Sequence, residues 1–336
     1  MTLYCGIDLH SNNHVIEVID DDDKRLLECK LPNDISATLD VLSPLQPHLA
    51  GIAVESTFNW YWLVDGLQDH GYTVHLVNTA AVKQYDGLKH TDDRYDAFHL
   101  AHLLRLGILP TGYICPRTKR SLRDALRRRG QLVRMRSKLL ISIQSQLWRS
   151  LGERYTSNNI ASPLFSLPDL DQDTTLALQT HLAVLHAISQ QIRLLEKHIK
   201  KRLTKTKDFA LLQSAIGIGP ILAMTILLET GEIERFAKVG NYSSYCRCVK
   251  SERLSNNKRK GKGNSKCGNK YLSWAFSEAA HFLVRYSPQA KRFYERKYRH
   301  KNGIVAIRAV AHKLARAVYY MLKRQEPFDI DRIFAH

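Results

Sequence analysis

The first hundred residues alternate strand-like and helical patterns in an order that few folds can accommodate. Three apolar runs, LYCGIDLH, HVIEVID and RLLECKLP, are separated only by short polar turns, which predicts an antiparallel meander. A helix from about residue 35, a buried strand at GIAVE, a helix at FNWYWLVDGLQDHG, a strand at YTVHLVN and a final helix follow. The order βββαβαβα therefore predicts a mixed sheet with helices packed against it.

Four carboxylates fall where this order brings distant segments together. Asp8 ends the first strand and Glu55 the fourth, while Asp93 and Asp96 lie one turn apart near the start of the last helix. This arrangement is typical of an α/β ribonuclease H-like fold, so we predict that the four side chains converge. Crowded carboxylates repel one another unless a cation neutralises them, and Mg²⁺ ions in such a site can promote phosphoryl transfer.

Acidic residues at a helix start have an alternative role, because they complement the positive end of the helix. We assign that role to Asp92, and metal binding to Asp93 and Asp96. The remaining ionisable groups nearby are expected to have packing, surface or solvated roles: His90, His99, Glu17 and Asp20 to Asp23.

The net charge of +18 is unevenly distributed along the chain. Residues 1–110 contain 7 Lys and Arg against 16 Asp and Glu, whereas the remainder contains 43 against 16. A merely solubilising surface is the alternative, but so large a basic excess favours binding to DNA or RNA, where cations gain affinity by releasing counterions.

After ILPTGYICP the chain becomes helical for about ninety residues. Two apolar stripes recur at steps of three or four and predict an antiparallel helical hairpin, suited to internal packing, to dimerisation or to gripping a phosphate backbone. The stripes contain Leu122, Leu126, Val133, Leu140, Ile143 and Leu147, then Leu178, Leu182, Leu185, Ile188, Ile192, Leu195, Ile199 and Leu203. Arg127, Arg128 and Arg129 are candidate phosphate ligands on the first of them.

Two later motifs are also candidates for nucleic-acid binding. Gly217 and Gly219 in IGIGP resemble the turn of a helix-hairpin-helix, although glycine also ends helices for steric reasons alone. A basic loop then follows Ser255, too polar to form a core and suited to closing on phosphates. Its candidate ligands are Lys258, Arg259, Lys260, Lys262, Lys266 and Lys270.

The six cysteines show no paired framework, and the start of the chain lacks the features of a signal peptide. We therefore expect reduced thiols, a cytoplasmic protein and no membrane association. Cys246, Cys248 and Cys267 could suggest zinc, but their spacing is not that of a zinc ribbon.

Several of these motifs together resemble the DEDD transposases of the IS110 insertion-sequence family, relatives of the pilin-gene-inverting recombinase. They are GID with Asp8, VEST with Glu55, D-x-x-D-A from Asp93, the IGIGP hairpin, and the serine and basic loop before GNKYLSWAF. The resemblance implies a RuvC-like catalytic domain at 1–112, a coiled coil at 113–206 and a C-terminal transposase domain at 207–336.

The resemblance also implies a chemistry. Asp8, Glu55, Asp93 and Asp96 would bind Mg²⁺, and Ser255 would attack the scissile phosphate in a composite site assembled between subunits on DNA. Because the neighbours of Ser255 differ from those in relatives, Ser251 and Ser265 remain alternatives. The implied partners are donor and target DNA, an element-encoded bridge RNA and further copies of the chain as a dimer or tetramer, in the bacterial cytoplasm at the nucleoid.

Two rival functions use the same residues differently. A RuvC-like Holliday-junction resolvase or structure-specific nuclease would need the carboxylates but would use water as nucleophile. A binding protein with a decayed site would need neither the carboxylates nor the serine.

Overall fold

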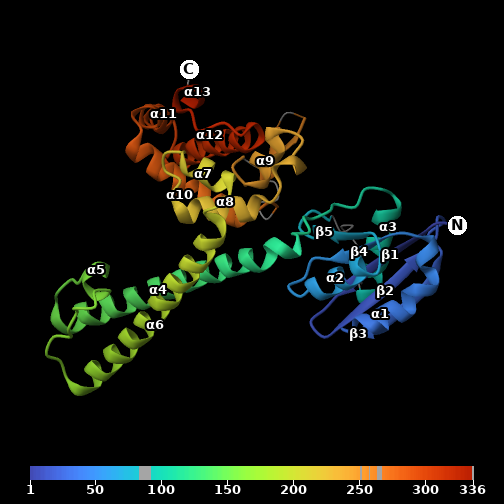
Figure 1. The fold of residues 1–336 in the computed structure, drawn as a ribbon, viewed down its shortest axis with the longest axis horizontal. Helices are drawn as coiled ribbons and strands as arrows, with labels where there is room; N and C mark the ends of the chain where they lie inside the picture. The colour runs from blue at the N-terminus through green and yellow to red at the C-terminus, as the bar shows by residue number, and fades with distance from the viewer. Residues whose placement is uncertain (83–91, 250–251, 257, 263–266, 335–336) are drawn as a thin grey trace. The chain divides into compact units, whose positions relative to one another are not determined.

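The computed structural model describes residues 1–82, 92–249, 252–256, 258–262 and 267–334 (Figure 1). The chain divides into two compact units. The first comprises Met1–Ile114 with Lys262–Cys267, and the second comprises Cys115–Gly261 with Gly268–His336. A mixed α/β sheet occupies the first unit, and the second is mostly helical.

The N-terminal unit contains the predicted order of elements. Strands β1 to β3 form the antiparallel meander, and β4 and β5 add to β1 in parallel, giving a five-stranded sheet of order β3-β2-β1-β4-β5. The bounds are β1 Leu3–Leu9, β2 Asn13–Ile19, β3 Arg25–Pro32, α1 Ile35–Leu42, the 3₁₀ helix η1 Ser43–His48, β4 Leu49–Glu55, α2 Tyr61–Asp69, β5 Val74–Val77 and α3 Asp93–Arg105.

The two faces of β1 have different partners, as its alternation predicts. Leu3, Cys5 and Ile7 are fully or almost fully buried in a core with apolar residues of α1 and α2. Gly6 lies on the opposite face, where α3 packs, and a Cβ on Gly6 would lie 2.0 Å from the carbonyl oxygen of Ala97. Glycine is therefore required for α3 to lie this close to the strand.

Two long helices, α4 Arg117–Leu151 and α6 Gln172–Leu203, run side by side in the second unit (Figure 1). Leu140 and Leu147 near the end of α4 cluster with Leu178 and Leu185 near the start of α6. Residues at the start of α4 instead share a core with residues at the end of α6: Leu122, Leu126, Ile199 and Leu203. The helices are therefore antiparallel, and the apolar stripes of the sequence form their contact.

The remaining elements form a helical body around a second large core. Buried aromatic side chains at its centre include Tyr242 and Phe276, whose rings meet edge to face. The elements are α5 Ser157–Ile160 in the α4–α6 connection, then α7 Lys207–Gln213, α8 Pro220–Thr230, η2 Ile233–Arg235, α9 Val239–Tyr245, β6 Glu252–Ser255, β7 Lys258–Lys262, α10 Lys270–Tyr286, α11 Pro288–Tyr298, α12 Gly303–Arg324 and α13 Ile330–Phe334. In the described part of the chain, no helix is both long and apolar enough to cross a bilayer.

Candidate active site

The strand-end carboxylates are brought together by the register of two parallel strands. Ile7 of β1 pairs with Val54 of β4, so Asp8 and Glu55 follow at neighbouring positions. Asp8 is only 3% exposed, and its side chain is close enough to Glu55 to form a hydrogen bond. Asp8 and Glu55 therefore lie side by side at the ends of their strands and are at least partly buried, in agreement with the convergence expected from the sequence.

Helix α3 supplies the other two carboxylates from its first turn. Its N-cap is Asp92, whose Oδ1 accepts a hydrogen bond of 2.8 Å from the backbone N–H of Tyr95, so the capping role predicted for Asp92 is confirmed. Asp93 and Asp96 follow within the first turn. Because the Gly6 contact holds α3 against β1 at Ala97, this turn lies beside the end of β1.

The carboxylates perturb one another's protonation. Burial, the hydrogen bond with Asp8 and the charges of Asp8 and Asp96 raise the pKa of Glu55 to about 8. Burial and the charge of Asp8 also raise the pKa of Asp96, with smaller contributions from Asp93 and Asp92, against an opposing effect of His99. The four predicted carboxylates therefore lie close enough to act on one another's charge, and added positive charge nearby would favour the ionised form of all of them.

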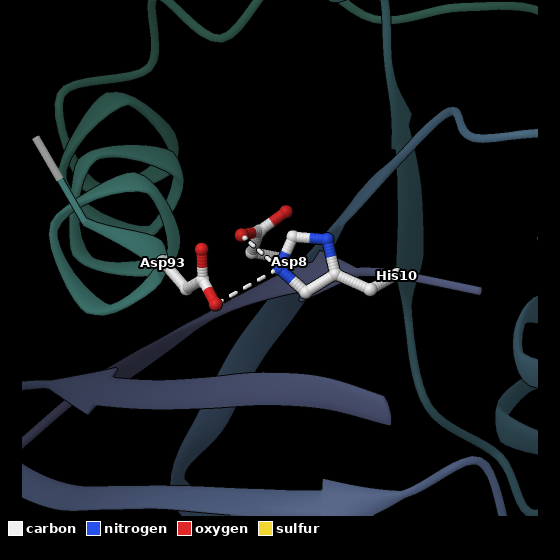
Figure 2. A group of neighbouring side chains, drawn as sticks. All are labelled: Asp8, His10 and Asp93. Atoms are coloured by element: carbon white, nitrogen blue, oxygen red, sulfur yellow. Dashed lines mark ion pairs between the residues drawn. The ribbon is translucent and has the colours of Figure 1, made fainter. Parts of the chain in front are cut away.

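His10 joins this group and was not predicted. Its Nε2 lies 3.2 Å from Asp8 Oδ2 and 3.2 Å from Asp93 Oδ2, between the two carboxylates (Figure 2). One ligand atom from each of these three residues lies within 4.8 Å of the others. Lys30 contributes another cation, with Nζ 3.8 Å from Asp93 Oδ2. Oxygen-rich donors with one imidazole suit a hard divalent cation.

The strand period could have revealed His10. Residues two apart on a strand point to the same face, so Asp8 indicates His10 directly. The backbone of His10 is fixed from two sides, because its carbonyl oxygen accepts hydrogen bonds from Asn33 Nδ2 at 3.1 Å and Asn59 Nδ2 at 2.9 Å. Thr57 in turn donates to Asn59 Oδ1 at 2.9 Å. These amides position the chain at the end of β1.

Glu17 corrects an expectation, because it is not a solvated charge. It pairs with Gly6 in the strand register and is 0% exposed on the face covered by α3. Burial, and to a smaller extent the nearby Glu28 carboxylate, raises the pKa of Glu17 to about 7 against the opposing charge of Arg25. The strand neighbours of Glu17 are apolar and buried, but the sequence alone does not show that α3 covers its face of the sheet.

The other acidic and histidine residues of this unit have structural partners. Asp20 is also buried, with Oδ1 accepting the backbone N–H groups of Asp22 and Lys24, whereas Asp21 and Asp22 are exposed. Asp23 pairs with Arg105 at 2.6 Å. His99 is 6% exposed and stacks on Tyr95, which supports packing, while His90 lies outside the described residues.

The arginine cluster of α4 is divided between internal pairs and solvent. Arg127 forms two hydrogen bonds of 2.7 Å with the buried carboxylate of Glu229. Arg129 Nε lies 2.7 Å from Glu196 Oε1, whereas Arg128 is bonded only to Gln131 among the described residues. Arg128 is therefore the most available of the three for a phosphate.

The glycine turn has a steric explanation at one of its two glycines. Gly217 has φ +90°, and a Cβ there would lie 2.5 Å from the carbonyl oxygen of Ala279 in α10. Gly219 is the N-cap of α8, and a Cβ on it would meet nothing within 4 Å. The packing of Gly217 against α10 accounts for that glycine without a ligand.

The basic segment forms secondary structure that the sequence did not predict. β6 ends at Ser255 and β7 begins at Lys258, and the two strands pair with each other. Arg259, Lys260 and Lys262 belong to β7, and Lys270 is exposed at the start of α10, whereas Ser251, Ser265 and Lys266 lie outside the described residues. Cys246 and Cys248 are buried in the apolar core, as expected for ordinary thiols.

Comparison with known proteins assigns both ends of the chain to one family. Residues 5–150 match the family model of DEDD transposases of IS110, and residues 209–295 match a model described as transposase of the IS116/IS110/IS902 family. No curated protein matches the chain. The first match contains all four convergent carboxylates, and the second contains Ser255 and the basic strands. The two matches occur in order and together cover more than half of the chain, which therefore belongs to the IS110 family of transposases.

Proposed function

We propose that this transposase cuts and rejoins DNA with a divalent metal, Mg²⁺, held by Asp8, Glu55, Asp93 and Asp96. The observation that carries the proposal is the convergence of these carboxylates, which raises the pKa of Glu55 to about 8. A bound divalent cation would neutralise the group and supply Lewis-acid stabilisation to phosphoryl transfer. The sheet order β3-β2-β1-β4-β5 supports a RuvC-like, ribonuclease H-like domain at residues 1–112.

His10 holds the acidic group together in this scheme. Between Asp8 and Asp93 its imidazole, when protonated, reduces their repulsion and keeps them near the positions needed for metal binding. Its neutral Nε2 is also a possible fifth donor. Asn33 and Asn59 fix the backbone that carries it, which limits how far the imidazole moves as the ligands assemble.

Ser255 is the proposed nucleophile, with Ser251 and Ser265 as alternatives. Its Oγ loses its proton and forms a bond to the scissile phosphorus while the bond to the departing DNA oxygen breaks, and that oxygen takes up a proton. The hydroxyl of a second strand then attacks the phosphoserine, releasing Ser255 and forming a new phosphodiester without ATP. The position of Ser255 at the end of β6, directly before basic β7, supports this role.

We propose that the coiled-coil segment 113–206 and the C-terminal transposase domain 207–336 provide assembly and nucleic-acid binding. We propose that the hairpin α4–α6 acts in assembly as a coiled coil, because several large apolar side chains on it are exposed: Met135, Ile141, Trp148, Leu176, Val184 and Leu194. A dimer or tetramer would cover them. The basic excess of residues 111–336 supports binding of donor DNA, target DNA and a bridge RNA that selects them.

A strand-exchange assay tests the proposed nucleophile. The protein, its copurifying RNA and labelled donor and target DNA are incubated with Mg²⁺, and products are separated under denaturing conditions. We expect the parent to form a denaturation-resistant protein–DNA adduct, and Ser255→Ala to abolish both the adduct and recombination. Ser251→Ala and Ser265→Ala are the matched controls and should retain activity.

Two outcomes would contradict the serine mechanism. Normal recombination by Ser255→Ala would exclude that residue, and loss in one control instead would transfer the role. Cleavage by the parent without any adduct would favour a resolvase-like nuclease that uses water, since this rival requires only the carboxylates.

A further inference from the structure

A cavity of about 480 Å³ lies between helices α4, α8 and α10 of the second unit. Its lining includes the cations Arg129, Arg134 and Lys270, the aromatic residues Tyr271 and Trp274, and Gly130. Sites for small organic ligands typically occupy about 300–1,000 Å³, so the cavity has the capacity for one. We refer to it as the Trp274 pocket.

Two charged residues of the pocket lining, Arg127 and Glu229, are bonded to each other. Glu229 is 3% exposed and accepts hydrogen bonds from Arg127 and from Asn269 Nδ2, the latter at 2.7 Å. The Arg127 guanidinium also lies over the ring of Tyr271, 4.5 Å from its centroid. These charges are satisfied internally, so they hold the pocket in shape rather than attract a ligand.

Two other cations of the lining, Arg134 and Lys270, have a different surrounding. Throughout the described residues, no acidic side chain forms an ion pair with Arg134 or Lys270, whereas Arg129 is paired with Glu196. Two such cations lining one pocket favour an anion, and both a guanidinium and an ammonium bind phosphate oxygens well.

Trp274 supplies an aromatic surface beside these cations. Lys270, Tyr271 and Trp274 occupy positions i, i+1 and i+4 of α10, so Lys270 and Trp274 lie on the same side of the helix. Trp274 is 44% exposed, and no ring stacks on it among the described residues. Lys270 Nζ lies 5.3 Å from the centroid of the Tyr271 ring, and an exposed indole beside cations that have no acidic partner among the described residues suits the stacking of a nucleic-acid base and the binding of its backbone.

Gly130 gives an independent indication that the pocket is kept open. It lies inside α4, a continuous helix of 35 residues, although glycine inside a helix costs about 1 kcal/mol relative to alanine. A Cβ at this position would meet only Arg134 Nη1, at 3.7 Å, so packing does not demand glycine. Because Gly130 has no side chain, α4 leaves the pocket open at this position.

We propose that the Trp274 pocket binds one unpaired nucleotide, with its base against Trp274 and its phosphate on Arg134 and Lys270. The inference rests on the proposed function only in taking nucleic acid as the source of the ligand. Bases in a duplex are stacked on one another and present no free face, so a single-stranded or extruded nucleotide is required. Single-stranded DNA and RNA share this chemistry.

The test compares fluorescently labelled ten-residue oligomers that differ only in their bases. Oligothymidylate, an abasic sugar-phosphate strand of equal length and oligouridylate are titrated with the full-length protein. We expect the thymidylate to bind about ten-fold more tightly than the abasic strand, given that stacking contributes roughly 1–3 kcal/mol per base. Tighter binding of the uridylate would identify RNA as the preferred source.

Variants of the pocket residues test whether this difference in affinity arises in the Trp274 pocket. Trp274→Ala should remove the ten-fold preference for bases without changing abasic binding, and Trp274→Phe should retain most of it. Gly130→Leu should fill the pocket and remove the same preference without lowering the free energy of unfolding. Gln131→Leu is the matched control, because Gln131 is exposed on α4 and outside the pocket lining.

The outcomes separate this inference from the proposed function. Equal binding of abasic and base-containing strands, or a preference that survives both Trp274→Ala and Gly130→Leu, would overturn the pocket assignment alone. Failure of the parent to bind any oligomer would overturn the pocket together with the nucleic-acid function. Photocrosslinking of a 4-thiothymidine oligomer should identify the peptide containing Tyr271 and Trp274.

Discussion

The first, acidic unit and the second, basic unit differ in where their charged side chains lie. In the first unit, strand register and the close packing of α3 bring carboxylates together and partly bury them. Their capacity to bind a cation therefore depends on their positions. In the second, cations such as Arg128, Arg134 and Lys270 lie at the surface, while Arg127 and Arg129 are neutralised internally. Geometry should therefore dominate single-residue effects in the first unit, and the amount of charge should dominate in the second.

The largest effect is expected from removing one carboxylate. Asp8→Ala or Asp93→Ala should reduce strand cleavage by at least about 1,000-fold, because metal-stabilised charge in the transition state is lost. Nucleic-acid affinity should change little. Cleavage of labelled DNA in Mg²⁺ and equilibrium titration, performed on the same preparations, give the two quantities. Normal cleavage by either variant would remove the acidic cluster from catalysis.

A smaller but still large effect is expected at Gly6, which tests position without altering charge. Gly6→Ala places a methyl group against the backbone of Ala97 and should lower the free energy of unfolding by about 3 kcal/mol or more. Urea denaturation measures the loss. Gly240→Ala is the control, since a Cβ on Gly240 meets nothing within 4 Å. Equal stability of the two variants would show that α3 adapts readily.

The buried Glu17 should make stability depend on pH. Its pKa is about 7 in the folded protein against 4.5 as its ordinary value, so the folded state binds the proton more tightly. The resulting stabilisation is complete below about pH 4.5 and is lost as pH rises through 7. Glu17→Gln should remove a pH-dependent change on the order of 1–3 kcal/mol. Denaturation at several pH values without metal measures it.

Asp40→Asn provides the reference for this pH series, because Asp40 is an exposed carboxylate of α1. Subtracting each variant's curve from that of the parent separates Glu17 from Glu55, whose pKa is also raised. A Glu17→Gln curve parallel to the parent's throughout pH 5–8 would contradict a shifted Glu17.

The smallest effect per residue is expected in the basic strands. Replacing Lys258, Arg259 and Lys260 by alanine should weaken binding to all sequences and flatten its salt dependence by roughly one unit of slope per lost phosphate contact. Titrations at several salt concentrations provide the slope. Alanine at Lys200, Lys201 and Lys205 removes the same charge elsewhere. An equal change in both triple variants would indicate diffuse attraction rather than a specific role for β7.

Sequence periodicity predicted the order of strands and helices in the first unit because each of these signals is local. The two faces of β1 and the stripes of α4 and α6 follow directly from side-chain alternation. Glu17 was wrongly expected to be solvated, because its burial depends on α3, more than 70 residues later in the chain. His10 was missed because the strand alternation was not continued two residues beyond Asp8. The β6–β7 pairing was missed because its composition is dominated by charge.

The contact at Gly6 has a consequence for chain length rather than composition. It attaches α3 to the sheet at Ala97, the residue directly after Asp96. Each residue of an α-helix turns by about 100°, so one residue inserted between Asp96 and Ala97 would rotate both helix carboxylates away from Asp8. All four carboxylates would still be present in the sequence, but Asp93 and Asp96 would no longer lie beside Asp8. The cluster therefore depends on the exact length of the chain at this junction as well as on the identity of its carboxylates.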